Sequence, residues 1–120
     1  MNQAEIKRKR AESILKELIP EALGALDDSR INSLNVVDVH CSKGRYDAKV
    51  YLDPEDLDQN QQQERLRQLQ MISNYITRYV KEAEGWYKAP RFTFFFDDQV
   101  GRINRIEELF KKIKSQTNGT

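Results

Sequence analysis

The spacing between apolar residues changes four times along this chain of 120 residues, and this alternation restricts the possible folds more than any other feature. Apolar residues recur at three- and four-residue steps over residues 6–26, which predicts an amphipathic helix. Over residues 35–52 the period falls to two, as in strands with one buried face. Helical spacing returns over 59–83, alternation over 91–96 and helical spacing over 99–114. The predicted order is therefore helix, strand, strand, long helix, strand, helix.

Proline and glycine mark the ends of several of these elements. Pro20 lacks an N–H group and crowds the carbonyl four residues back, so we expect either a kink there or a fresh helix with Pro20 in its first turn. Gly44 lies between the two alternating segments and can supply the positive φ of a hairpin turn. Gly85 is suited to a C-terminal helix cap, and Asp97 and Asp98 can cap the last helix.

The buried face of each element follows from the same spacing. In the first strand Val37, Val39 and Cys41 share one face, and His40 lies on the other. In the second strand Tyr46, Ala48, Val50 and Leu52 alternate with Asp47, Lys49 and Tyr51, and in the third strand Phe92, Phe94 and Phe96 lie on one face and Thr93 and Phe95 on the other. The predicted buried stripe of the long helix is Leu66, Leu69, Ile72, Ile76, Val80 and Ala83.

Length and composition favour one folded domain. Charged residues make up 32% of the chain, yet Leu, Ile, Val and Phe together number 30, a quarter of it, which exceeds the fraction typical of disordered chains. Three strands and helices that each need a buried face predict a two-layer α+β domain. We expect that domain to span residues 1–115, with residues 116–120 as a frayed tail.

Catalytic and metal chemistry find little support. The single thiol and the single imidazole, Cys41 and His40, are adjacent on a strand and point to opposite faces, so they cannot form a nucleophile and base pair or a zinc site. Cys41 is expected to be a small buried hydrophobe and His40 an exposed strand residue, with a phosphate contact as the alternative for His40. The five glycines are scattered, which excludes a glycine-rich phosphate loop. These observations favour a non-catalytic protein. Since no apolar run can span a membrane or serve as a secretory signal, we also expect a cytoplasmic protein.

Charge is unevenly distributed although the net charge is only +1. Residues 1–16 and 99–120 each carry five basic and two acidic side chains, whereas residues 53–58 carry four acids and no base. The run 7–10 is either a solvated helix end or a phosphate-binding surface. A second basic group, Arg78, Lys81, Lys88 and Arg91, lies near Tyr75, Tyr79, Trp86 and Tyr87. Such interleaving suits RNA binding, and packing is the alternative for Tyr79 and Trp86.

Motifs in the hairpin, the third strand and the last helix occur in a distinctive order. Ser42-Lys43 is followed by Ala-Lys-Val-Tyr at 48–51, and residues 90–97 read Pro-Arg-Phe-Thr-Phe-Phe-Phe-Asp. Residues 102–109 read Arg-Ile-Asn-Arg-Ile-Glu-Glu-Leu. Together they resemble the S-R-D-L-x-x-A-K-V-Y, P-E-L-x-F-x-x-D and R-I-x-x-L signatures of the ribosome-binding factor A family. The resemblance covers about residues 5–112.

The resemblance implies a type II KH-like fold, in which a three-stranded sheet carries its helices on one face. In this family a kinked helix pair marked by A-x-G replaces the usual GxxG loop. The matching positions are Ile72, Ser73 and Asn74, so the marker is absent. Because Asn tolerates a left-handed backbone, the alternatives are a kink at Ser73 and Asn74 or a straight helix. Gly44 stands where the family has Asp, and Thr77 replaces an arginine, with Arg78 one place on.

The resemblance also implies a role in assembly of the bacterial small ribosomal subunit. Members of the family bind free small subunits, assist late maturation of the ribosomal RNA including its 5′ end, and matter most in the cold. They act without catalytic residues or a cofactor, and assembly GTPases are associated with their release. We expect a monomer whose partners are the small subunit and its RNA. The residues expected to contact RNA are Lys7, Arg8, Arg10, Lys49, Arg78, Lys81, Lys88 and Arg91.

Two other function classes stay open on the sequence alone. A protein-interaction module would dock a partner through the outer face of the sheet or the C-terminal helix. A small hydrolase or ligand-binding enzyme would need a deep polar pocket. RNA binding is distinguished from an apolar interface by its strong salt dependence. It also requires cations from distant segments to gather on a common surface once the chain is folded.

Overall fold

The computed structural model describes residues 2–44 and 46–97. Its elements are α1 (Gln3–Gly24), α2 (Ser29–Asn32), β1 (Val36–Cys41), β2 (Asp47–Leu52), α3 (Gln59–Met71), α4 (Ser73–Glu84) and β3 (Arg91–Phe96). The helix expected over 99–114 and the tail expected over 116–120 lie outside the described residues. Within the described part, the predicted order of elements is confirmed, with the short α2 in addition.

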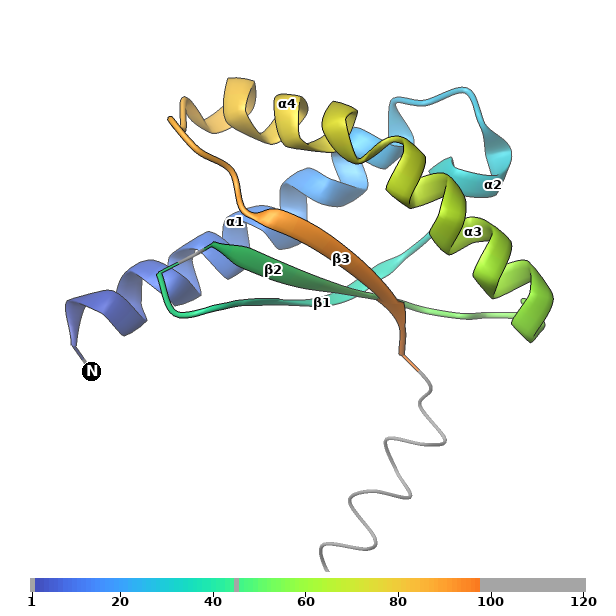
Figure 1. The fold of residues 1–120 in the computed structure, drawn as a ribbon, viewed down its shortest axis with the longest axis horizontal. Helices are drawn as coiled ribbons and strands as arrows, with labels where there is room; N and C mark the ends of the chain where they lie inside the picture. The colour runs from blue at the N-terminus through green and yellow to red at the C-terminus, as the bar shows by residue number, and fades with distance from the viewer. Residues whose placement is uncertain (1, 45, 98–120) are drawn as a thin grey trace, which may run out of the picture.

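The three strands form one sheet in the order β1-β2-β3, with β1 and β2 antiparallel and β2 and β3 parallel. The helices cover one face of this sheet (Figure 1). The core lies between the two layers, and its fully buried large side chains come from both: Leu15, Ile19, Leu23, Ile31, Val50, Leu52, Leu69, Ile76 and Val80. The predicted two-layer α+β architecture is therefore confirmed.

The first helix continues through Pro20, so the fresh start considered for that position is wrong. The missing N–H of a proline inside a helix costs about 3 kcal/mol. Leu15, Ile19 and Leu23 lie on both sides of the proline and are all fully buried. Burying each such side chain contributes about 1.5–3 kcal/mol, which offsets the cost and keeps the helix in one piece.

The hairpin forms with two differences from the predicted faces. Gly44 has φ +84°, as the turn requires. A β-bulge between Val36 and Asp38 shifts the register, so that Val36, in place of Val37, packs against the core with Val39 and Cys41. Tyr46 precedes the first residue of β2 and is 73% exposed, so it does not share the buried face of Ala48, Val50 and Leu52 with which the alternation grouped it.

The long helix predicted over 59–83 is divided at Ile72, whose φ of −100° and ψ of 13° end α3 and begin α4. Backbone hydrogen bonds from Ile72 to Gln68 and from Ile76 to Ile72 continue on both sides, which makes the interruption a kink. Ser73 and Asn74 form the first turn of α4, one residue beyond the interruption, and Asn74 is not left-handed. Ala83 is exposed, because it lies beyond the last buried turn of α4, so its predicted burial is wrong.

The third strand spans the predicted residues, and Phe92, Phe94 and Phe96 share one face as predicted. Phe94 is buried, and Phe92 and Phe96 pack against the core. Cys41 is buried and His40 is exposed, as expected. Among the helices of residues 2–44 and 46–97, none has the length and apolar character that would let it span a membrane.

Candidate nucleic-acid interface

The pairing of β2 with β3 brings two distant connections together. The strands are parallel, so both begin at the same end of the sheet, with Asp47 in register with Arg91. The backbone N–H of Arg91 donates to the carbonyl of Tyr46 at 2.9 Å. The turn between β1 and β2 therefore lies beside the connection between α4 and β3. The N-terminus of α1 lies at this same end, on the left of Figure 1.

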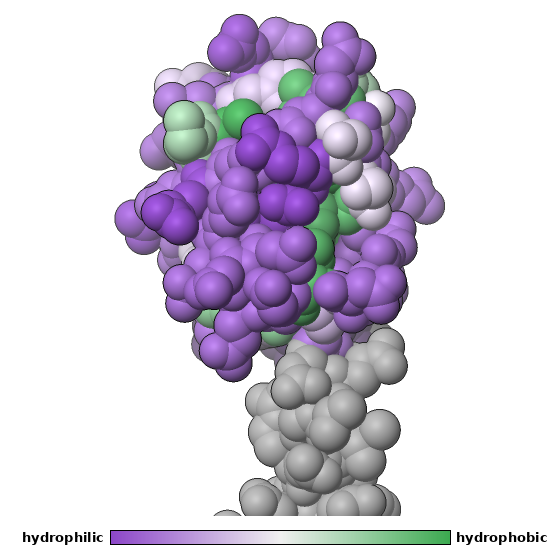
Figure 2. All heavy atoms as spheres, turned by 90° about the vertical axis from the view of Figure 1, so that its right-hand side faces the viewer, coloured by the Kyte–Doolittle hydropathy of each residue, from purple (hydrophilic) through white to green (hydrophobic). Residues whose placement is uncertain are grey.

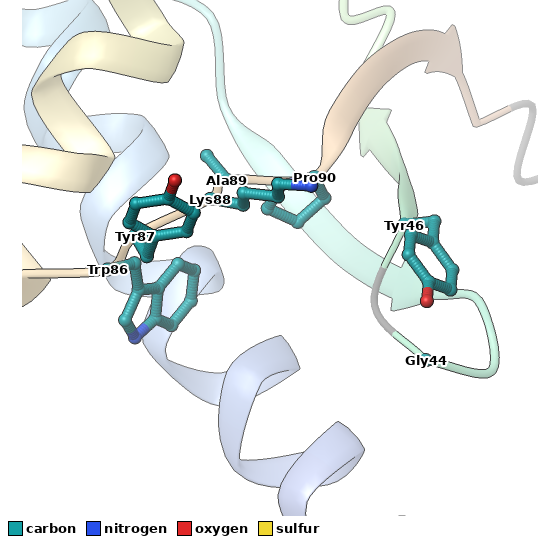
Figure 3. Close-up of a pocket in the computed structure, with 7 residues that line it drawn as sticks. All are labelled: Gly44, Tyr46, Trp86, Tyr87, Lys88, Ala89 and Pro90. Carbon is teal, nitrogen blue, oxygen red and sulfur yellow. The ribbon is translucent and has the colours of Figure 1, made fainter.

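A cleft with aromatic walls opens between the turn and the connection. It has a volume of about 310 Å³ and is lined by Gly44, Tyr46, Trp86, Tyr87, Lys88, Ala89 and Pro90, which we call the aromatic cleft. Figure 3 shows Trp86 and Tyr87 on one side and Tyr46 and Gly44 on the other, with Pro90 between them. Trp86 packs partly against the core, whereas Tyr46 and Tyr87 are 73% and 89% exposed.

A second hollow of about 290 Å³ adjoins the cleft and shares Gly44 with it. Its other lining residues are Asn2, Ala4, Glu5, Arg8 and Lys43. The two hollows therefore bring together three cations from distant segments, Arg8, Lys43 and Lys88, which we call the cationic end. Within residues 2–44 and 46–97, no carboxylate lies within the 4.0 Å of an ion pair from any of the three, although Glu5 lines the second hollow.

The eight cations singled out in the sequence lie in different parts of the molecule. Arg8 and Lys88 belong to the cationic end, and Lys7 and Arg10 are exposed on the same half of α1. Arg91 follows the aromatic cleft and pairs with Asp47 at 3.1 Å. Lys49, in register with His40 and Thr93, points away from the helices on the outer face of the sheet. The exposed Arg78 and Lys81 belong to α4, in the helical layer.

Acidic side chains gather at the other end of the sheet. The acidic segment 53–58 follows Leu52, which pairs with the first residue of β1, and it is therefore remote from the turn at Gly44. Asp27 and Asp28 follow the C-terminus of α1, and Asp28 pairs with Arg30 at 3.1 Å. Figure 2 views the molecule from this side and shows a mainly hydrophilic surface with a narrow apolar band. The small net charge thus conceals a separation of positive and negative ends, which orients a protein toward a polyanion.

Two of the aromatic residues near the second basic group are packing residues. The hydroxyl of Tyr75 donates to the carbonyl of Ala22 at 2.8 Å. The ring of Tyr79 lies 6.1 Å from that of Tyr75. Burial, together with the nearby Glu21 carboxylate, raises the pKa of the Tyr79 hydroxyl. For Tyr79 the packing alternative therefore holds, and for Trp86 it holds in part, since Trp86 also lines the aromatic cleft.

The sequence interpretation missed Tyr46 and Lys43. The alternation of the second strand extends back to Tyr46 and grouped it with Ala48, Val50 and Leu52. The available signal was its position two residues after a turn glycine, where a side chain can lie outside the sheet. Lys43 was quoted only as part of a motif, and its position next to Gly44 was the signal that it projects from the turn.

The outer face of the sheet forms a second, separate cluster. The ring of Tyr51 stacks on that of Phe95 with centroids 5.6 Å apart, and His40 meets Tyr51 edge-on at the same distance. His40 Nε2 lies 3.0 Å from an oxygen of Asp38, so an acid already faces this imidazole. In the described ranges, no three His, Cys, Asp or Glu side chains are close enough together to hold a metal ion.

Comparison with known proteins identifies the family and the fold of the chain. The family model described as ribosome-binding factor A matches residues 7–110. The chain is 49% identical over 118 residues to the ribosome-binding factor A of Campylobacter jejuni, covering 98% of each. The crystal structure of the Thermus thermophilus ribosome-binding factor A superposes with a TM-score of 0.65 at 24% identity, over 74% of this chain and 93% of that one.

A homology model of the same Thermus thermophilus protein, fitted into the cryo-electron-microscopy map of a complex with the 30S subunit, gives a TM-score of 0.58 at 24% identity. This match covers 69% of this chain and 87% of that one. These likenesses show the fold, which is KH-like as expected. With the family model matching most of its length, the chain belongs to the ribosome-binding factor A family.

Proposed function

We propose that this chain binds free small ribosomal subunits as a non-catalytic assembly factor and assists late maturation of their RNA, including its 5′ end. Membership of the ribosome-binding factor A family supports the proposal. So does the 30S complex into which the similar Thermus thermophilus factor has been fitted. Release with the help of assembly GTPases, a greater need in the cold and a monomeric state belong to the same proposal.

The observation that carries the proposal is the cationic end. Arg8, Lys43 and Lys88 come from three separate segments, line adjoining hollows and have no carboxylate partner among the described residues. Cations in such an arrangement neutralise phosphates and release counterions. By binding one RNA conformation more tightly than others, they shift the population toward it without any catalytic group.

The contact residues are proposed in two ranks. Arg8 and Lys88 come first, joined by Lys43 and by their exposed neighbours Lys7 and Arg10 on α1. Arg91 is next to this group, but its guanidinium is already paired with Asp47. Lys49, Arg78 and Lys81 lie on other surfaces, so they contact RNA only if it wraps around the molecule.

Binding to purified small subunits tests the proposal directly. We expect the chain to sediment with free small subunits and Lys43→Gln/Lys88→Gln to bind them more weakly. The slope of log affinity against log salt should fall by about 0.7–0.9 for each phosphate that the variant no longer neutralises. Lys16→Gln/Arg67→Gln is the matched control, because both residues are exposed cations away from the cationic end. Equal weakening by the two double variants would contradict the assignment of the surface.

Analysis of the RNA in a depletion strain tests the maturation step. We expect precursor small-subunit RNA with an unprocessed 5′ end to accumulate, more strongly in the cold. Normal processing in the depleted strain, together with recovery of the chain outside the free-subunit fractions, would overturn the proposed function.

The alternative of a protein-interaction module is favoured by one observation. Phe95 is 39% exposed and stacks with Tyr51 on the outer face of the sheet, opposite the helices. An interface of this kind buries apolar area and responds little to salt. A partner whose binding is unchanged between low and high salt, and is lost in Phe95→Ser, would support this second function.

A further inference from the structure

The aromatic cleft has a property that phosphate binding alone does not explain. Among the described residues, five large hydrophobic side chains are strongly exposed, and two of them, Tyr46 and Tyr87, line this one cleft. Aromatic rings contribute most when they are buried, so two such rings facing water in one hollow point to a ligand. They also come from segments that are about forty residues apart along the chain.

The walls of the cleft are held in place before any ligand arrives. A Cβ atom on Gly44 would lie 2.7 Å from Cε2 of Tyr46, so the ring rests directly against the bare glycine. The carbonyl of Tyr46 accepts a hydrogen bond from Arg91, which ties this wall to β3. On the other side, the buried Pro90 limits the freedom of the connection that carries Tyr87 and Lys88. Such preorganisation reduces the entropy lost on binding.

The charge around the cleft selects the class of ligand. Lys88 lines the cleft itself, and Lys43 and Arg8 line the hollow that shares Gly44 with it. None of the residues lining the aromatic cleft is acidic. Flat rings beside cations suit a nucleotide, whose base stacks on an aromatic face while its phosphates meet the cations. The volume of about 310 Å³ is at the lower end of the range for small-ligand sites.

We propose that the aromatic cleft receives one unpaired base of single-stranded RNA, stacked against Tyr46 and Tyr87, while the adjoining phosphates lie at Lys88 and Lys43. This inference rests on the proposed function and adds to it. A surface that bound only phosphates would accept duplex and single strand alike, whereas a base can enter the cleft only if it is free to leave its stack. The cleft therefore makes the chain selective for an unpaired segment of the ribosomal RNA.

Trp86 provides a direct signal for this step, because it is the only tryptophan and lines the same cleft. The probes are a single-stranded RNA of about eight nucleotides and a matched strand with abasic riboses. We expect the RNA to quench Trp86 fluorescence and to bind about 5- to 150-fold more tightly per stacked base than the abasic strand. Equal binding and equal quenching by the two strands would overturn the inference.

Substitutions then locate the base. Tyr46→Leu and Tyr87→Leu should each weaken RNA binding within the same range while leaving the salt slope unchanged, and Tyr46→Phe should retain it. Both residues are largely exposed, so folding should be unaffected. Tyr51→Leu is the matched aromatic control on the outer face of the sheet. Weakening by Tyr51→Leu but by neither cleft variant would place the base elsewhere and overturn the inference.

The same variants separate this inference from the proposed function. If the wild-type chain does not bind small subunits at all, the proposed function fails. If it binds them, and Lys43→Gln/Lys88→Gln weakens binding while the two leucine variants match wild type, the cleft inference fails alone. Quenching of Trp86 by an apolar or proline-rich peptide but not by RNA would also overturn the inference, because it would assign the cleft to a protein ligand.

Discussion

The contact between α1 and the edge of the sheet offers a quantitative test of how the cationic end is held in place. The carboxylate of Glu12 accepts a hydrogen bond from the backbone N–H of Cys41 at 2.8 Å, across 29 positions of the chain. Cys41 is the last residue of β1, which is an edge strand. Glu12 therefore attaches α1 to this edge strand at Cys41. Cys41 lies three residues before the turn glycine Gly44.

The structure sets the size of the effect. A hydrogen bond to a charged group contributes about 1.5–3 kcal/mol. The Glu12 side chain is 21% exposed. Because water can compete for it, we expect Glu12→Ala to lower the free energy of unfolding by about 1.5–2 kcal/mol. At about 4 °C per kcal/mol for a domain of this size, Tm should fall by about 6–8 °C. Glu12→Gln keeps an oxygen acceptor but loses the charge, so its loss should be about half as large.

Thermal and urea unfolding followed by the fluorescence of Trp86 measure these differences. The control is Glu17→Ala, which removes an exposed carboxylate from the same helix. This control should stay within about 0.5 kcal/mol of wild type. If Glu12→Ala and Glu17→Ala unfold at the same temperature, the contact with Cys41 does not stabilise the fold, and the argument from its geometry is refuted.

Three further predictions concern the helices. Because Leu69 is fully buried, Leu69→Ala should lower the free energy of unfolding by about 2–5 kcal/mol. Met71 is 84% exposed, so Met71→Ala should stay within about 0.5 kcal/mol of wild type. Equal urea midpoints for Leu69→Ala and Met71→Ala would contradict the burial of Leu69 near the end of α3. Gly85 has φ +67°, so Gly85→Ala should destabilise by about 1–2 kcal/mol. Gly24 has no positive φ and has open space around it, so Gly24→Ala should raise the free energy of unfolding by about 0.4–1 kcal/mol. A higher Tm for Gly85→Ala than for Gly24→Ala would refute this. The hydrogen bond from Arg30 holds the pKa of the Asp28 carboxyl below its ordinary 3.8. The folded pKa is the lower one, so this stabilisation is complete above the unfolded value and is lost as the pH falls through the folded value. The stability difference between wild type and Asp28→Asn should therefore shrink below about pH 3.8, and a difference that grows on acidification would be inconsistent with the assignment.

Much of the fold could be predicted because its signals are local. The change of period at residue 35, the positive φ of Gly44 and the cap at Gly85 each depend on a few neighbouring residues. The failures occurred where tertiary packing decides. The bulge after Val36 changes which valine faces the core, and the burial of Leu15, Ile19 and Leu23 keeps α1 continuous through Pro20. The helical spacing over residues 6–26 runs through Pro20, but it does not show that packing outweighs the proline, and no periodicity in the sequence encodes the bulge.

The candidate site was less predictable than the fold. Its cations were visible in the sequence, but Lys88 lies beside the hollow of Arg8 and Lys43 only because β3 joins β2 in parallel. Tyr46 illustrates the same limit. Its place in an alternating run is indistinguishable from that of Val50, yet the first residue of β2 is Asp47, and Tyr46 is left to line the aromatic cleft.

The parallel pairing of β2 and β3 is the step that turns a nearly neutral chain into one with a cationic end. Because β1 and β2 form a hairpin, the turn at Gly44 and the acidic segment 53–58 must lie at opposite ends of the sheet. With β3 parallel to β2, Arg91 begins beside Asp47, and Lys88 joins the turn. An antiparallel β3 would have begun beside Leu52, and Lys88 would have faced the four acids of that segment. The composition of the chain would be the same, but Lys88 would be separated from Arg8 and Lys43, and the aromatic cleft would lose one of its two walls.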